Sequence, residues 1–263
     1  MSRNIHPSAV VSARAHLGEN VTIGPYVVIE DDAVIGDDSW IGPSAFIGER
    51  TRIGRRCKIH NSASVGSPPQ DLKYRGEATN LEIGDDTVVR EFAALNRGTI
   101  ESGKTVIGSN CLLMAYTHVA HDCFVGNNVI MANCATLAGH VRLDDHVIIG
   151  GLTPVHQFCR VGEHALVGGA FRVVKDVPPY VLAGQTPLVF EGLNLIGLRR
   201  RGFSRETIDQ IDLAYRIIYR SHLNVSQAVD QLRKENSHIP EVGKIIDFIS
   251  SSKRGIIPGH SRS

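Results

Sequence analysis

The stretch IGPYVVIEDDAVIGDDSWIGPSAFI, residues 23–47, carries an aliphatic residue at every sixth position. The same period extends from Ile5 to Val173, where 26 of 29 positions are Ile, Val, Leu or Met and the exceptions are Asp71, Glu77 and Glu101. Because 42% of the chain is apolar, fewer than half of these positions would be aliphatic by chance. Helices and plain strands have side-chain periods of about 3.6 and 2.0 residues, so neither explains a period of six.

A period of six is typical of the hexapeptide repeat of parallel β-helices. Three hexads form one triangular coil, in which the aliphatic residue and a small residue four positions later point into the prism. Glycine often follows the aliphatic residue, and we expect it to tolerate the backbone conformation of the corner. Each coil should lie about 4.8 Å from the next. Stability then accumulates by stacking, because no single coil can bury its own face.

The repeat is interrupted between Val65 and Ile83 and again between Leu95 and Ile107. We expect both segments to be loops that project from the prism, and the first contains two prolines and a glycine. Long loops on a rigid scaffold often carry function. The repeat ends after Val173, and Val177-Pro-Pro-Tyr180 stops it because proline cannot donate to the strand ladder.

Helical spacing of three and four residues appears after the repeat. Helices are predicted to begin behind a Ser204 cap, near Ser226 and at Pro240. The chain is therefore predicted to be an all-β parallel β-helix over residues 1–186, followed by a small helical domain over residues 187–263.

Composition argues against several classes of protein. The net charge of +1 is not that of a nucleic-acid binder. The chain lacks an apolar leader and a transmembrane-length apolar run, so we expect a cytoplasmic protein without a transmembrane segment. Four cysteines occupy small inward positions and are predicted to be buried free thiols. They are Cys57, Cys111, Cys123 and Cys159.

The segment Thr117-His-Val-Ala-His-Asp-Cys123 concentrates titratable groups in one coil. Because a coil of three hexads stacks on the next, Gly139 should lie over His121 and His140 over Asp122, about 5 Å away. If the glycine N–H points outward to the histidine, the pair resembles a general base beside an oxyanion donor. Acyl transfer needs both elements.

Other interpretations of the polar residues stay open at this point. Histidines can be solvent-exposed side chains on the outer face of a prism without any function, as we expect of His16, His146 and His164. A zinc site is a second alternative, because related prisms that hydrate carbon dioxide bind zinc through three histidines, although the spacing here does not match that pattern. The basic run from Arg199 to Arg205 is either a solvated surface or a phosphate-binding cluster.

Six motifs resemble the UDP-N-acetylglucosamine O-acyltransferase family, and they occur in that family's order over nearly the whole chain. They are QDLKY (70–74), HVAHDC (118–123), TLAGH (136–140), VHQF (155–158), DVPPY (176–180) and RRGFS (200–204). The resemblance implies a left-handed β-helix and a homotrimer with active sites between adjacent prisms. It also implies transfer of an R-3-hydroxyacyl group from acyl carrier protein to the 3-hydroxyl of UDP-N-acetylglucosamine, the first step of lipid A synthesis. The donor group travels on the carrier's phosphopantetheine, so no metal or bound cofactor is implied.

The resemblance also implies roles for individual residues. His121 would be the general base, Asp122 would orient it, and the Gly139 N–H would hold the oxyanion. Substrate contacts are implied for Gln70, Asp71, Lys73, His118, His140, His156, Gln157, Asn194, Arg200 and Arg201. Among these, Asn194 and the two arginines would bind the nucleotide phosphates or the carrier's prosthetic group.

The acyl-chain length is expected to depend on Gly169, Phe171 and Arg172. Phe171 and Arg172 depart from the family pattern, which has small residues there, so a shorter donor is predicted. Asn96 replaces a histidine, and Ile196 replaces an acidic residue, at positions where acceptor contacts are expected.

Three competing functions remain. N-acyl transfer to a UDP 3-amino sugar would use the same scaffold. A zinc-dependent carbonic anhydrase belongs to another class of enzyme. A purely structural repeat protein is the third alternative, but it gives no reason for the register that joins the histidines to Asp122 and Gly139.

Overall fold

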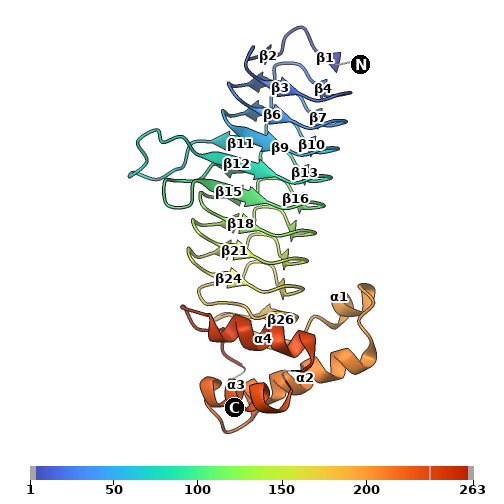
Figure 1. Ribbon diagram of the computed structural model, residues 1–263, viewed down its shortest axis with the longest axis vertical. Coiled ribbons are helices and arrows are strands. Elements are labelled where there is room, and N and C mark those ends of the chain that lie inside the picture. Colours follow the sequence, from blue (N-terminus) through green and yellow to red (C-terminus); the bar gives the residue numbers. More distant parts are fainter. Residues whose placement is uncertain (1–3, 237, 260–263) are drawn as a thin grey trace.

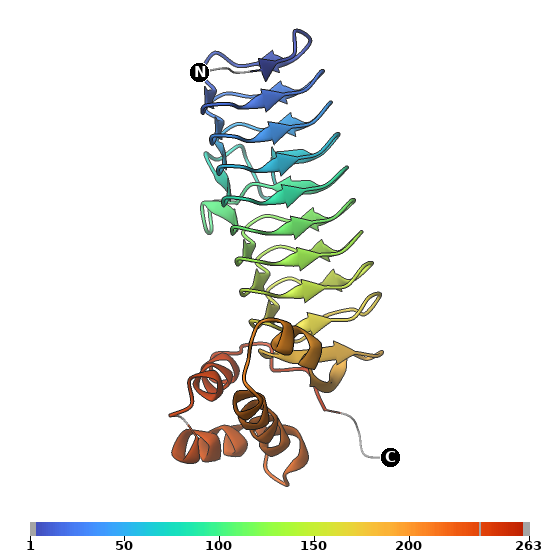
Figure 2. The same cartoon turned by 90° about the vertical axis from the view of Figure 1, so that its right-hand side faces the viewer.

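The computed structural model describes residues 4–236 and 238–259. The chain forms a column of stacked triangular coils with helices gathered at its C-terminal end (Figures 1 and 2). It is a left-handed parallel β-helix followed by a helical part, as the sequence predicts. None of the helices in the described residues is long and apolar enough to cross a membrane.

Each coil contributes one short strand to each of three sheets, which we call A, B and C and which are parallel except where the last two strands of sheet A pair antiparallel. Sheet A contains β1 (Asn4–Ile5), β4 (Thr22–Ile23), β7 (Trp40–Ile41), β10 (Lys58–Ile59), β13 (Val88–Val89), β16 (Leu112–Leu113), β19 (Ile130–Met131), β22 (Ile148–Ile149), β25 (Leu166–Val167), β26 (Val181–Gly184) and β27 (Val189–Leu193). Sheet B contains β2 (Val10–Val11), β5 (Val28–Ile29), β8 (Phe46–Ile47), β11 (Ser64–Ser67), β14 (Ala94–Asn96), β17 (His118–Val119), β20 (Thr136–Leu137) and β23 (Pro154–Val155). Sheet C contains β3 (His16–Leu17), β6 (Val34–Ile35), β9 (Thr51–Ile53), β12 (Asn80–Ile83), β15 (Lys104–Ile107), β18 (Phe124–Val125), β21 (Arg142–Leu143) and β24 (Arg160–Val161).

The predicted 18-residue register is confirmed where the repeat is unbroken, because His118 pairs with Thr136. The interruptions lengthen single coils, so that Ile59 pairs with Val89 and Leu95 pairs with Val119. Both interruptions form loops that leave the prism on the same side (Figure 1). From Leu17 onward the aliphatic hexad residues fill the interior, and the four inward cysteines are buried free thiols, as predicted.

The expected role of the hexad glycines is wrong. Left-handed backbone occurs two residues after them, on residues such as Asn20 and Asp38, with φ of 56° and 59°. Gly18 has no positive φ, but a Cβ there would lie 2.7 Å from the backbone nitrogen of Asp37 in the next coil. Glycine is therefore needed because adjacent coils approach closely, and the corner conformation is supplied by other residues.

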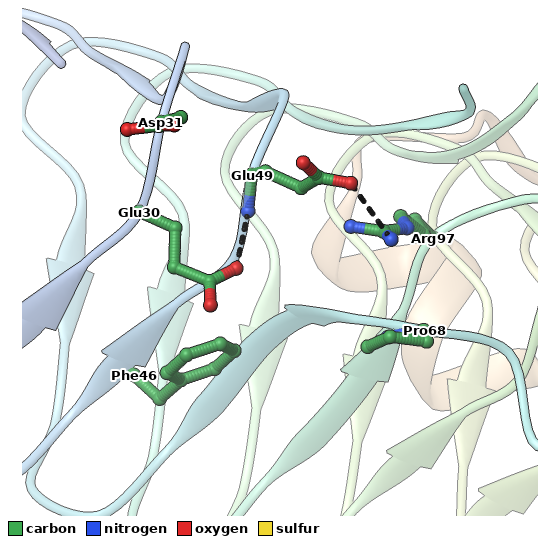
Figure 3. Close-up of a pocket in the computed structure, with 6 residues that line it drawn as sticks. All are labelled: Glu30, Asp31, Phe46, Glu49, Pro68 and Arg97. Atoms are coloured by element: carbon green, nitrogen blue, oxygen red, sulfur yellow. Dashed lines mark hydrogen bonds and ion pairs between the residues drawn. The ribbon is translucent and has the colours of Figure 1, made fainter. Parts of the chain in front are cut away.

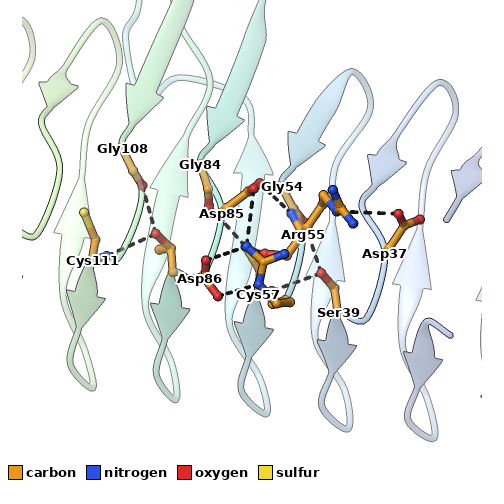
Figure 4. A network of polar contacts seen from close by, with 12 residues as sticks. Asp37, Ser39, Gly54, Arg55, Cys57, Gly84, Asp85, Asp86, Gly108 and Cys111 are labelled. Carbon is orange, nitrogen blue, oxygen red and sulfur yellow. Dashed lines mark hydrogen bonds and ion pairs between the residues drawn. The ribbon is translucent and has the colours of Figure 1, made fainter. Parts of the chain in front are cut away.

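Side chains also connect successive coils at the corner between sheets C and A (Figure 4). The backbone N–H of Arg55, two residues after the hexad isoleucine, donates to Asp85 Oδ1 at 2.8 Å. In the same coil, the Cys57 N–H donates to Ser39 Oγ at 3.1 Å. The Arg55 N–H is therefore satisfied at the surface and the Cys57 N–H in the buried interior, in both cases by a side chain of a neighbouring coil.

The helices are α1 (Leu195–Arg200), α2 (Arg205–Arg220), α3 (Val225–Glu235) and α4 (Pro240–Ser250). The three predicted helices are present, and Ser204 caps α2 by accepting from the Thr207 N–H at 3.0 Å. Helix α1 was not predicted. The boundary expected after residue 186 falls in the turn between β26 and β27, which are paired in sheet A, so the helical part begins at Leu195.

Candidate active site

His121 and Asp122 lie directly after β17, at the corner between sheets B and C. Asp122 has a φ of 59°, the left-handed conformation of the corner. In the next coil, the His140 N–H donates to the His121 carbonyl oxygen at 3.1 Å. The structure thus brings His121, Asp122, Gly139 and His140 together, as the register predicts.

The Asp122 carboxylate is fully buried and holds the His121 ring. Its Oδ2 lies 2.8 Å from His121 Nδ1. It also accepts from the Thr99 N–H at 2.8 Å, from Thr99 Oγ1 at 2.6 Å and from the Ser102 hydroxyl. Burial disfavours the ionised form of Asp122, but the hydrogen bonds from Ser102, Thr99 and His121 outweigh it and lower the pKa of this carboxyl.

Thr99 and Ser102 are site residues that the sequence reasoning missed. Both lie in the second loop, between β14 and β15, where the hexad register is interrupted. The break in the hexad repeat could have indicated them, because a loop inserted one coil above the segment that contains His121 and Asp122 can reach that segment. When the ionised Asp122 accepts a hydrogen bond from the protonated Nδ1 of His121, Nε2 is the basic nitrogen of the ring.

Gly139 packs directly against the His121 ring. A Cβ at Gly139 would lie 2.6 Å from His121 Cε1 and 2.8 Å from Nε2, so no larger residue fits without moving the ring. At the same hexad position on a different corner, between sheets C and A, the N–H groups of Ser109 and Asn127 are capped by side chains of the following coil. Within the described residues, no group accepts the Gly139 N–H. It is available to an oxygen atom of a ligand beside Nε2.

His140 extends the polar corner beside this pair. Its ring lies edge-on to His121 with centroids 5.2 Å apart, and it stacks on Phe158 at 4.7 Å. His140 Nε2 lies 3.6 Å from Asp122 Oδ2 and 3.4 Å from the carboxylate of Glu101 in the second loop. His140 is thereby placed between two acidic side chains at the edge of the site.

A groove of about 380 Å³ runs along the outer face of sheet B, beginning at His118 and passing His156. Burial lowers the pKa of His118, so this imidazole is neutral near pH 7. Thr136, Ala138 and Pro154 supply the small and apolar lining between the two histidines. The exposed Gln157 follows His156, whose Nδ1 lies 3.1 Å from the Gln157 carbonyl oxygen.

Of the three residues expected to set acyl-chain length, only Arg172 lines this groove. Phe171 packs against the prism core, and its ring lies over Gly168, where an added Cβ would be 2.9 Å from the ring. The expectation that Phe171 narrows the groove is therefore wrong, because it occupies the inward position of its hexad. Gly169 is exposed beyond the lining residues.

The residues expected to bind phosphate lie elsewhere on the chain. The Asn194 side chain caps α1, accepting from the Gly197 N–H at 3.2 Å and donating to the His164 carbonyl at 2.9 Å. Arg200 is exposed in the last turn of α1. Arg201 donates to the His146 carbonyl at 3.4 Å, and burial lowers its pKa. His146 lies at the corner between sheets C and A, so one chain does not bring Arg201 and His121 together.

The first loop, residues 68–79, carries Gln70, Asp71 and Lys73. Gln70 and Lys73 are exposed, and Asp71 Oδ1 accepts from the Lys73 N–H at 2.9 Å. A cavity of about 510 Å³ lies at the base of this loop and is bordered by Pro68 and Arg97 (Figure 3).

His121, Asp122 and His140 are the group, among the described residues, whose ligand atoms lie close enough to hold a metal, all within 4.8 Å. The group offers two imidazoles and one carboxylate, and it includes neither His118 nor His156. It therefore differs from the three-histidine site of the zinc alternative.

Known proteins are similar to this chain over nearly its whole length. The family model "Udp N-acetylglucosamine O-acyltransferase; Domain 2" matches residues 176–257, and the bacterial transferase hexapeptide model (six repeats) matches residues 32–67 and 104–139. Acyl-[acyl-carrier-protein]–UDP-N-acetylglucosamine O-acyltransferase of Trichlorobacter lovleyi is 54% identical, over 97% of this chain and 100% of the relative. The protein of that name from Thiobacillus denitrificans is 47% identical, over 96% and 98%.

Solved structures show the same similarity. UDP-N-acetylglucosamine acyltransferase from Bacteroides fragilis has a TM-score of 0.94 and 46% identity, covering 96% of this chain and 99% of the other. The enzyme from Campylobacter jejuni has a TM-score of 0.93 and 40% identity, covering 98% and 100%.

Proposed function

Because this chain belongs to the UDP-N-acetylglucosamine O-acyltransferase family, we propose that it transfers an R-3-hydroxyacyl group from acyl carrier protein to the 3-hydroxyl of UDP-N-acetylglucosamine. It is an acyltransferase, and this acylation is the first step of lipid A synthesis. The observation that carries the proposal is the contact between His121, held by a buried Asp122, and the Gly139 backbone. The cytoplasmic location stays a prediction.

His121 Nε2 removes the proton from the sugar hydroxyl as its oxygen attacks the thioester carbonyl carbon. The ionised Asp122 stabilises the imidazolium that forms, through its contact with Nδ1. The carbonyl oxygen becomes an oxyanion, and the Gly139 N–H donates to it. When the carbon–sulfur bond breaks, the phosphopantetheine thiolate leaves and takes the proton from His121. The ester is formed, and the histidine is neutral again.

The remaining site residues divide between the two substrates. Gln70, Asp71 and Lys73 contact the sugar from the first loop, and His118 and His140 contact the sugar or the acyl group. His156 and Gln157 lie next to them along sheet B. The acyl chain follows the groove on sheet B, whose small and apolar lining suits a hydrocarbon, and the side chain of Arg172 ends it.

We propose a homotrimer, because the two parts of the expected site lie at different corners of one prism. If sheet B of one copy faces sheet A of the next, His121 of the first approaches Arg200 and Arg201 of the second. The three corners between sheets A and B then meet at the axis. Exposed aromatic and aliphatic residues at that corner support this arrangement, since apolar surface there would be covered. They are Tyr26, Phe92, Tyr116 and Leu152.

N-acyl transfer to a 3-amino sugar nucleotide is the alternative acceptor chemistry. A neutral amine attacks with its own lone pair, whereas a hydroxyl needs a base at the moment of attack. The fully buried Asp122 behind His121 therefore favours the hydroxyl acceptor.

The test is acyl transfer from hydroxyacyl carrier proteins of varied length to UDP-N-acetylglucosamine and to its 3-amino analogue. We expect faster transfer to the hydroxyl acceptor and a loss of about 10²–10⁴-fold in His121→Ala, with folding and trimerisation unchanged. Preference for the amine would overturn the acceptor assignment. A His121→Ala variant that kept more than a third of the wild-type rate would show that His121 is not the general base.

A further inference from the structure

The first loop is joined to the prism by two adjacent residues at the end of β14. Asn96 is buried, and its Nδ2 donates to the Pro68 carbonyl at 3.0 Å, at the start of the loop. Arg97 follows it and reaches the middle of the loop. Its Nη2 and Nε lie 2.9 and 3.2 Å from the Tyr74 hydroxyl oxygen, to which both donate.

Arg97 is held on its other side by the prism. Its Nη2 lies 3.0 Å from Glu49 Oε1, and only 6% of the arginine side chain is exposed (Figure 3). The Glu49 backbone is itself fixed, because its N–H donates to Glu30 Oε2 at 3.0 Å. Arg97 therefore connects a rigid coil to the Tyr74 hydroxyl, and Tyr74 in turn donates to the Glu77 carbonyl at 2.9 Å within the loop.

This connection lies beside a hollow. The cavity of about 510 Å³ is bordered by Phe46, Glu30 and Pro68, as well as by Glu49 and Arg97. A loop beside such a cavity is stabilised little by side-chain packing on that side. The polar contacts of Arg97 therefore set the position of the loop. Arg97 also stands at the corner position one coil above His121, because Leu95 pairs with Val119.

We propose that Arg97, through the Tyr74 hydroxyl and Glu49, is the positioning residue that keeps loop 68–79 in the conformation that binds the sugar nucleotide. This inference rests on the proposed function, in which Gln70, Asp71 and Lys73 contact the acceptor. Arg97 does not touch the reacting atoms. If the loop occupies its binding conformation for only a fraction of the time, the apparent affinity falls by that fraction, while the saturated enzyme reacts normally.

The experiment compares Tyr74→Phe and Glu49→Gln with wild type in two assays. Tyr74→Phe removes only the hydroxyl and lies outside the prism core, so folding is preserved. We expect it to raise KM for UDP-N-acetylglucosamine severalfold, because the loop loses both hydrogen bonds from Arg97 and is in its binding conformation for less of the time, with kcat within about twofold. KM for the acyl carrier protein should not change. Glu49→Gln should raise the same KM severalfold.

The second assay is limited proteolysis by trypsin, read by mass spectrometry at the exposed Lys73 and Arg75. Cleavage follows the open population of the loop, so trypsin should cut Tyr74→Phe faster than wild type. Glu82→Gln is the matched control, because Glu82 pairs with Lys104 at 3.0 Å with an exposure of 35%, close to the 34% of Glu49. It should change neither assay.

An unchanged acceptor KM and unchanged cleavage in Tyr74→Phe would overturn the proposal. So would a rise in KM for the carrier protein in place of the acceptor. If the wild-type protein did not acylate UDP-N-acetylglucosamine but trypsin still cut Tyr74→Phe faster, the proposed function would be refuted. The conclusion that Arg97 anchors the loop would still be supported.

Discussion

Replacing Gly139 by alanine should inactivate the enzyme without unfolding it. Gly139 has no positive φ, so alanine fits the backbone. Its methyl group would lie 2.6 Å from His121 Cε1, and ordinary contact begins at 3.4 Å, so the ring must move by about 0.8 Å. That movement would strain the 2.8 Å contact of Nδ1 with Asp122 and displace Nε2 from the attacking hydroxyl. A displacement of about 1 Å can cost about 10²-fold in rate.

The assay is kcat for acyl transfer at saturating substrates, together with circular dichroism, thermal unfolding and the oligomeric state. Alanine keeps the backbone N–H, so any loss reports on the position of the ring and not on the oxyanion donor. Gly151→Ala is the matched control, because Gly151 occupies the equivalent hexad position and its added Cβ would be no closer than 3.2 Å to any neighbour. A Gly139→Ala enzyme that retained more than a third of the wild-type kcat would refute the reasoning.

Neutralising Arg200 and Arg201 together should raise KM for the nucleotide sugar or the carrier protein more than it lowers kcat; steady-state kinetics with both KM values unchanged and only kcat reduced would contradict this. Burial and the neighbouring His146 lower the pKa of His164 from its ordinary value of 6.5 to about 4. Between these two pH values the unfolded chain binds a proton at His164 and the folded protein does not. Stability should therefore fall by about 2 kcal/mol between pH 7.5 and 5 in urea unfolding, and His164→Phe should flatten that slope; an equal slope in the variant would exclude His164 as its source. Arg172→Gly should shift the optimum to longer acyl donors, with a change of about tenfold in preference for two additional methylenes. Phe171→Ala should lower stability and leave the chain-length profile unchanged. An unchanged profile in Arg172→Gly would show that Arg172 does not end the groove.

The hexad period alone was enough to predict the β-helix and the contacts that follow from its register. A period of six over most of the chain can be satisfied only by a prism with an aliphatic interior, because each hexad is one side of a coil. Once the coil length is known, counting along the chain places Gly139 over His121 and His140 over Asp122. Ser204 was likewise predictable as a helix cap, because capping depends on local hydrogen bonds.

The features that break the register depend on long-range contacts and could not be predicted. Thr99 and Ser102 reach Asp122 from an inserted loop, and counting hexads cannot place a loop that leaves the prism. Phe171 faces the core because its hexad position overrides the expectation of a groove wall. The separation of Arg201 from His121 was also unpredictable, since it depends on which corner of the prism receives α1. Repeats specify local stacking, whereas the loops and the helical part are placed by contacts between residues far apart in the sequence.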